Sequence, residues 1–320
     1  MSEPAVTRNN SLLVARSRHP MHVRTGPEGP VEAGDTDART TVMNPTARGG
    51  YSPNRAVGPW RVPTRGPRVL RMPAFRDDFD GDALDPAVWD PHYLPAWSSR
   101  AATAARHRVS ESRLRLWIPP DQPLWCPDQH PTPLRVSGIA SGGHSGPVGS
   151  TVAGQRFLDD QRVREEQPRF EGWLPDRGSF AVVCRMELSD RSMAGVWLSG
   201  FEESPQDSGE LCLVEVFGKD RVPRRSAEVG MGIKKLHDPR LEQDFQAPRL
   251  PIDVGQWHEY AVRWDEQVAE FAVDGEHVRT CARPPTYPLQ VMIAVFDFPD
   301  WPGDASVPAL EVDWIGGETP

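Results

Sequence analysis

Short runs in which apolar and polar residues alternate constrain the fold of this chain more than any other feature. The run "FAVVCRMEL" (180–188) is the longest, and it places five apolar side chains on one face: Phe180, Val182, Cys184, Met186 and Leu188. Similar runs are "RLRLWI" (113–118), "EYAVRW" (259–264), "VMIAVF" (291–296) and "LEVDWI" (310–315). Because successive side chains of a strand point to opposite faces, such runs bounded by Gly and Pro predict an all-β fold, an antiparallel β-sandwich or jelly roll.

Turn residues and composition support this interpretation. The stretch "VAEFAVDGEHVRTC" (268–281) predicts a hairpin with Asp274 and Gly275 in a type I′ turn. The chain has 320 residues with 34 Pro and 27 Gly, and hydrophobic residues make up 38%. This balance fits a loop-rich β protein, and neither a long helical pattern nor an internal repeat is found.

The first 72 residues differ in character from the rest. Residues 1–71 hold 11 Arg and contain breakers such as "TGPEGP" and "PTRGP". We therefore predict a disordered Pro/Arg/Gly-rich extension over 1–72 and one β domain over 73–320. Two alternatives remain for the extension. It is a basic tether, or the reading frame begins at Met72, which directly precedes "PAFRDDFDG".

Charge and targeting signals narrow the classes of partner. The net charge is −9, concentrated in the body of the chain, so nucleic acid is not an expected partner. The sequence contains no stretch of about 18 apolar residues, so no membrane span is predicted. The apolar run "SLLVA" is too short for a signal peptide. We expect a cytoplasmic monomer with no membrane partner, with export by a non-classical route left open.

The four cysteines are Cys126, Cys184, Cys212 and Cys281. None is spaced as C-x-x-C, which argues against a zinc site or a thioredoxin-like motif. They lie in predicted strands, where buried free thiols are expected.

The stretch "GELCLVEVFG" (209–218) carries two carboxylates in an otherwise apolar run. In a regular strand Glu210 and Cys212 share one face while Glu215 points to the other, so joint action requires a β-bulge. Retaining glycoside hydrolysis uses two carboxyl groups about 5–5.5 Å apart, a nucleophile and an acid/base. The alternative is that both glutamates are solvated charges at the ends of a strand.

The order of motifs around this stretch resembles glycoside hydrolase family 16, the family of laminarinases and lichenases with a concanavalin A-like fold. The family motif is E-[ILV]-D-[ILVFM]-x-E, and "ELCLVE" (210–215) follows it except at the third position. Matching segments are "FRDDFDGDALDPAVWDP" (75–91), "VSGIASG" (136–142), "SMAGVWLSG" (192–200), "WHEYAVRWDEQVAEFAVDGE" (257–276) and "DWPG" (300–303). The resemblance covers roughly residues 75–317 in matching order.

The resemblance implies that Glu210 is the nucleophile and Glu215 the general acid/base. It also implies that Cys212 stands where the family has an Asp that hydrogen-bonds the nucleophile. A thiol is a weak donor and is mostly neutral at pH 7. Either Glu210 ionises more easily and activity survives, or Glu210 loses its orienting partner and turnover falls. A reactive thiol at Cys212 ranks below both, because two neighbouring carboxylates should raise its pKa.

Sugar sites need flat apolar surfaces as well as polar groups. We select Trp197, Trp97 and Trp173 as substrate-binding candidates, with core packing as the alternative for each. Trp173 lies in a segment over 142–178 that reads as an insertion lining or covering the site. Either of two histidines, His144 and His237, could lie in the cleft or on the surface.

The expected function is hydrolysis of a β-glucan-like polysaccharide by a retaining two-carboxylate mechanism. The alternative is a lectin-like protein that binds carbohydrate with little or no turnover. A third hypothesis is trimming of an intracellular or cell-envelope glycan of the producing organism. No cofactor or metal is required. The resemblance leaves open a structural calcium near the chain ends, where Asp313 is a candidate ligand.

Overall fold

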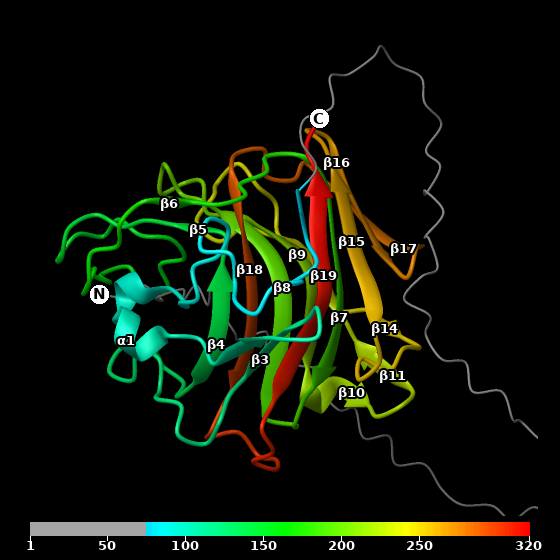
Figure 1. Cartoon of the computed structure of the whole chain (residues 1–320). Coiled ribbons are helices and arrows are strands. Elements are labelled where there is room, and N and C mark those ends of the chain that lie inside the picture. Colours follow the sequence, from blue (N-terminus) through cyan, green and yellow to red (C-terminus); the bar gives the residue numbers. More distant parts are fainter. Residues whose placement is uncertain (1–74) are drawn as a thin grey trace, which may run out of the picture. The chain divides into compact units, whose positions relative to one another are not determined.

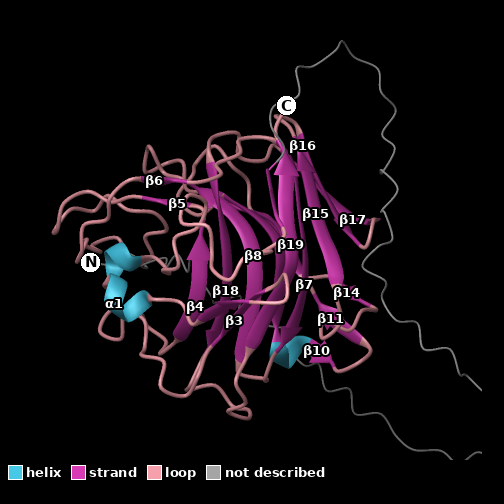
Figure 2. Ribbon diagram, in the orientation of Figure 1, coloured by secondary structure: helices cyan, strands magenta, loops and turns pink. Residues whose placement is uncertain are grey.

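Two antiparallel sheets stacked face to face form the body of the protein (Figures 1 and 2). The computed structural model describes residues 75–320. The eight-stranded sheet has the order β17 (Glu276–Ala282), β16 (Val268–Val273), β15 (His258–Trp264), β7 (Gly178–Glu187), β19 (Ala309–Glu318), β3 (Leu114–Trp117), β2 (His107–Val109), with β1 (Phe75–Asp77) also paired to β19.

The six-stranded sheet lies against this first sheet. Its order is β13 (Asp244–Gln246), β12 (Gly230–Lys234), β9 (Glu210–Phe217), β8 (Ser192–Gly200), β18 (Leu289–Asp297), β4 (Arg135–Ala140). Strands that are neighbours here are far apart in the sequence, as in the pairing of β18 with both β8 and β4. The predicted antiparallel β-sandwich of the jelly-roll type is confirmed.

The remaining elements are short. Two small sheets are formed by β10 (Arg221–Val222), β11 (Ser226–Glu228) and β14 (Arg249–Leu250), and by β5 (Gly142–Gly143) and β6 (Phe170–Glu171). The described helices are α1 (Arg100–Thr103) and the 3-10 turns η1 (Pro95–Trp97) and η2 (Gly218–Asp220). None of the helices within residues 75–320 has the length and apolar character needed to span a bilayer.

The core between the sheets follows the predicted alternation. All five apolar residues of the 180–188 run belong to it, and so do Leu114, Leu116 and Ile118. The hairpin of β16 and β17 turns at Asp274 and Gly275, whose φ angles of 52° and 79° fit the predicted type I′ turn. All four cysteines are buried free thiols, as expected. The strand prediction is wrong for Cys126, which lies in a loop with a φ of 43°.

The predicted boundary between extension and domain lies just before β1. The extension predicted over residues 1–72, with its alternative start at Met72, falls outside the described residues, so that part of the prediction stays a prediction.

Burial of aromatic side chains between the sheets should dominate the stability of the domain. Phe271 on β16 is fully buried, whereas Val268 on the same strand is 37% exposed. We expect Phe271→Ala to lower the free energy of unfolding by about 3–5 kcal/mol, because it removes buried apolar surface and leaves a cavity. Val268→Ala, the control, should change it by about 0.5 kcal/mol or less. Urea denaturation compares the two, and equal losses would contradict this account of the core.

Candidate active site

An extra residue in β9 determines how the two glutamates are displayed. On β8 the adjacent residues Trp197 and Val196 pair with Cys212 and Val214, so Leu213 has no partner of its own. On the other side, β12 shows the same irregularity. Its residues Gly232 and Gly230, two apart, pair with Cys212 and Glu215, three apart. β9 therefore contains a β-bulge at Leu213.

The bulge changes which side chains face the core. Leu213 and Val214 both belong to the core between the sheets, although they are consecutive. Glu210, Cys212 and Glu215 therefore share the opposite face of the six-stranded sheet, which we call the site face. The bulge that joint action of the two glutamates requires is present, and the two glutamates lie on one side of the sheet.

Glycines on the neighbouring strands make room for this bulge. A Cβ atom on Gly195 of β8 would lie 2.9 Å from the Val214 carbonyl oxygen, which the bulge brings close. On β12, Gly232 has a φ of +128°, a conformation that residues with side chains rarely adopt.

One lysine lies between the two carboxylates. Lys234 is paired with Glu210 across β12 and β9. Its Nζ lies 2.6 Å from Oε2 of Glu215 and 3.9 Å from Oε2 of Glu210. These two oxygens are therefore at most about 6.5 Å apart, the sum of the two distances. This bound fits the short carboxyl separation of retaining enzymes better than the wider separation of inverting ones.

The two glutamates have different surroundings. Glu210 is 3% exposed, while the side chain of Glu215 is 16% exposed. Burial raises the pKa of Glu210 to about 7; Glu215 adds to the increase, and the charge of Lys234 opposes it. Burial alone would lower the pKa of Lys234, but the charge of Glu215 raises it. Lys234 is therefore held as an ammonium ion.

Cys212 lies on the site face between the glutamates but makes no hydrogen bond to either. Its Sγ contacts the Gly230 carbonyl oxygen at 3.8 Å. Burial raises the pKa of this thiol well above its ordinary value, and both glutamates add to the increase. Cys212 is therefore a neutral thiol, which disfavours its interpretation as a reactive nucleophile.

The predicted insertion covers Glu210. From this long connection between β4 and β7, the side chain of Gln155 reaches the site face and is 1% exposed. Its Nε2 lies 3.0 Å from Glu210 Oε1, 2.6 Å from Ser199 Oγ and 3.2 Å from Met292 Sδ. The expectation that this segment lines or covers the carboxylates is confirmed for the part around Gln155.

Three side chains from other parts of the chain hold this section of the insertion in place. Trp97 Nε1 donates to the Gly154 carbonyl at 2.8 Å. The Gln155 N–H donates to Glu202 at 2.7 Å, and His237 Nε2 lies 2.9 Å from the Arg156 carbonyl. Burial raises the pKa of Glu202 to about 8, so this third carboxyl group is largely neutral near pH 7.

Of the three tryptophans selected from the sequence, only Trp197 lies on the site face. It is paired with Cys212 across β8 and β9 and is 7% exposed, and its Nε1 is buried without a hydrogen-bond partner among the described residues.

The structure does not bring the other two tryptophans to the site face as open surfaces. Trp97 is fully buried and anchors Gly154. Trp173 packs against the core, with its ring stacked on Phe75 at 4.8 Å and on Phe180 at 5.5 Å. For both Trp97 and Trp173, the structure agrees with packing in the interior, the alternative to substrate binding.

A small cavity lies next to Gly154, and neither glutamate of the site face lines it. Its volume is about 40 Å³, close to the space of one water molecule. His144, Phe201, Gln290 and Met292 are among its lining residues.

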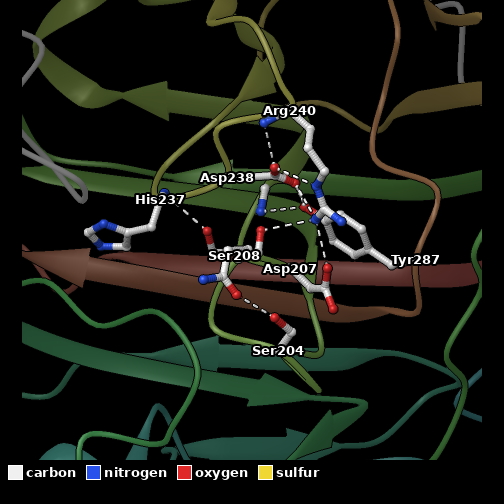
Figure 3. Close-up of polar contacts among 9 residues, drawn as sticks. Ser204, Asp207, Ser208, His237, Asp238, Arg240 and Tyr287 are labelled. Atoms are coloured by element: carbon white, nitrogen blue, oxygen red, sulfur yellow. Dashed lines mark hydrogen bonds and ion pairs between the residues drawn. The ribbon is translucent and has the colours of Figure 1, made fainter.

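A polar network fixes the start of β9 (Figure 3). The hydroxyl of Tyr287 accepts a hydrogen bond from Gly209 N–H at 2.7 Å and donates to Asp238 at 3.0 Å. Arg240 pairs with both Asp238 and Asp207. Although burial alone would raise it, hydrogen bonds from Arg240 and Tyr287 hold the pKa of Asp238 below its usual value. Glu210 therefore follows directly on an anchored residue.

Three residues of the site were not selected from the sequence: Gln155, Glu202 and Lys234. A signal existed for Lys234. Gly230, Gly232 and Lys234 alternate in the strand after the motif, so pairing this strand with β9 would have placed the lysine beside the glutamates. Neither Gln155 nor Glu202 belongs to a pattern, because both lie in irregular backbone with positive φ angles of 54° and 60°.

Asp313, named as a candidate calcium ligand, lies 3.7 Å from the guanidinium of Arg113. Across residues 75–320, no three His, Cys, Asp or Glu side chains are grouped to hold a metal ion.

Comparison with solved structures agrees with the two-sheet architecture. A GlcNAcα1-4Gal releasing endo-β-galactosidase from Clostridium perfringens matches 81% of this chain and 65% of its own, with 20% identity and a TM-score of 0.64. This chain thus spans just under two thirds of that protein. A laminarinase catalytic domain from Thermotoga petrophila matches 78% of this chain and 98% of its own, with 14% identity and a TM-score of 0.53.

A laminarinase from Flavobacterium sp. matches 77% of this chain and 99% of its own, with 15% identity and a TM-score of 0.51. At such identities these likenesses show the fold. No curated protein matches the sequence. Residues 178–316, which include β7, β8, β9 and β12, match the family model described as glycosyl hydrolases family 16. The strands that display Glu210 and Glu215 on one face thus lie within the part of the chain that is similar to glycosyl hydrolases family 16.

Proposed function

We propose that this protein is a retaining endo-glycosidase that cleaves a polysaccharide of the β-glucan type. The observation that carries the proposal is the bulge at Leu213, which places Glu210 and Glu215 on one face within reach of the same lysine. Glu210 attacks the anomeric carbon, and Glu215 protonates the leaving oxygen and then activates water.

The substrate class is supported by the relatives. Laminarinases and an endo-β-galactosidase, all of them named as enzymes that cleave glycans, share the fold. The net charge of −9 suits a neutral substrate better than an anionic one. Trp197 supplies the aromatic surface on the site face.

A second candidate function, carbohydrate binding without turnover, is favoured by one contact. Glu215 accepts a hydrogen bond from Lys234 at 2.6 Å, whereas a general acid must donate a proton to the leaving oxygen. A pure binding protein would retain an insoluble glucan without releasing reducing ends and would lose that binding in Trp197→Ala. Release of reducing ends would exclude this second function.

Replacing either glutamate should abolish hydrolysis. We expect Glu210→Gln to lower kcat by about 10³-fold or more, since the nucleophile is lost. Glu215→Gln should lower it by about 10²- to 10⁴-fold, since proton transfer is lost. Reducing-end release is measured on laminarin, lichenan, agar, carrageenan and a glycan ending in GlcNAcα1-4Gal. The control is Glu228→Gln, which changes an exposed glutamate on β11. Equal cleavage by all four proteins would refute both assignments.

The pH dependence should reflect the burial of Glu210. Its pKa is raised to about 7, so the reactive carboxylate is present above that pH and is lost as pH falls through it. We therefore expect kcat/KM to decrease on the acid side with an apparent pKa near 7. Because the charge of Lys234 lowers the pKa of Glu210, Lys234→Met should move this limb to higher pH. An acid limb near 4.5, the ordinary glutamate value, would contradict the prediction.

A further inference from the structure

The carboxylate of Glu210 has few partners for a group that must be held in one orientation. Its hydrogen-bond donor among the described side chains is Gln155, through Nε2 at 3.0 Å. Lys234 is farther away, at 3.9 Å, and Cys212 is turned toward the Gly230 carbonyl. Cys212 therefore does not orient Glu210, whereas Gln155 does.

The carboxylate decides which end of the amide faces it, because an ionised carboxylate only accepts hydrogen bonds. Gln155 Nε2 also lies 2.6 Å from Ser199 Oγ, and Ser199 is the partner of Glu210 on β8. The other end of the amide, Oε1, is buried without a hydrogen-bond partner among the described residues. The amide thus presents its nitrogen to the carboxylate, and its oxygen is buried without a partner among the described residues.

The backbone that carries Gln155 is built to hold this position. Its φ of 54° is unusual for a residue with a side chain. The clamp from Trp97, Glu202 and His237 fixes three consecutive residues, 154 to 156. Such over-determined strain is characteristic of functional sites.

We propose that Gln155 is the positioning residue of Glu210, donating from the insertion the hydrogen bond that the side chain at position 212 does not supply. This inference rests on the proposed function, since it assigns how the nucleophile of that reaction is oriented.

Kinetics of matched variants test the proposal. Loss of a hydrogen bond to a charged group should lower kcat of Gln155→Ala about 10- to 100-fold. In Gln155→Met, which removes the donor but keeps Glu210 covered, the acid limb should also move to higher pH, because the donor favours the ionised form of Glu210. The double variant Gln155→Ala/Cys212→Asp should recover at least about tenfold, since a protonated carboxyl at 212 is a donor on the same face.

The matched control is Gln161→Ala. Gln161 belongs to the same insertion and is 1% exposed, but its side chain accepts hydrogen bonds from the backbone of Phe157 and Leu158 and does not contact Glu210. We expect it to leave the acid limb unmoved. If Gln155→Met and Gln161→Ala lose activity equally with unchanged pH profiles, Gln155 serves only the folding of the insertion and the proposal fails.

A second measurement separates this proposal from the proposed function. In protein labelled with ¹³C at the glutamate carboxyls, the Glu210 signal is the one missing in Glu210→Gln. Its pKa should rise in Gln155→Met, which removes the donor but keeps Glu210 covered. The charged and titratable groups that act on or respond to Glu210 are the same residues in both proteins: Lys234, Glu215, Glu202 and Tyr93. An inactive protein with this rise refutes only the hydrolase assignment. An unchanged pKa refutes the role of Gln155 whether or not the protein cleaves glycans.

Discussion

The extra residue in β9 is the constraint on which the site depends. A regular strand would turn Glu215 into the sandwich and leave Glu210 alone on the site face. With Leu213 inserted, two consecutive apolar residues enter the core and the glutamates meet on the other side. Gly195 and Gly232 flank the bulge where a side chain would clash or be strained. Packing and chemistry are thus coupled in one short strand.

The charges around the bulge explain how carboxylates can be buried there. Each isolated ion would be costly to remove from water, so a buried charge needs a partner. Lys234 provides it for Glu215 directly and for Glu210 at longer range. Glu210 retains a raised pKa because its burial is nearly complete, and Gln155 is the neutral donor that reaches it. The site is therefore assembled from β9, β12 and a distant loop.

Much of the fold followed from local sequence rules. Three predictions each followed from the geometry of a single strand or turn. They are the alternation in 180–188, the turn at Asp274 and Gly275, and the opposite faces that Glu210 and Glu215 would have in a regular strand. The burial of Trp97 and Trp173 could not be predicted in this way. Trp97 is covered by Gly154, and Trp173 lies against Phe75, contacts that only the folded insertion creates.

The same limit explains the residues that were missed. Gln155 reaches Glu210 across 55 positions of sequence, and its loop has no period that could be read. The position of Lys234 could have been predicted by pairing strands. It lies in the strand that follows the motif, and the alternation of that strand places it opposite Glu210. The strands of the six-stranded sheet could thus be predicted one by one from the sequence, whereas the insertion that covers Glu210 could not.

The most direct test of the central claim is to find the residue that becomes covalently linked to the sugar. Treating the protein with a 2-fluoro glycoside of the polysaccharide it cleaves slows release of a glycosyl-enzyme intermediate. Mass spectrometry of the digested protein then locates the added sugar. The account predicts one glycosyl group on Glu210 and none on Glu215. A label on Glu215, or cleavage with inversion and no adduct, would contradict it.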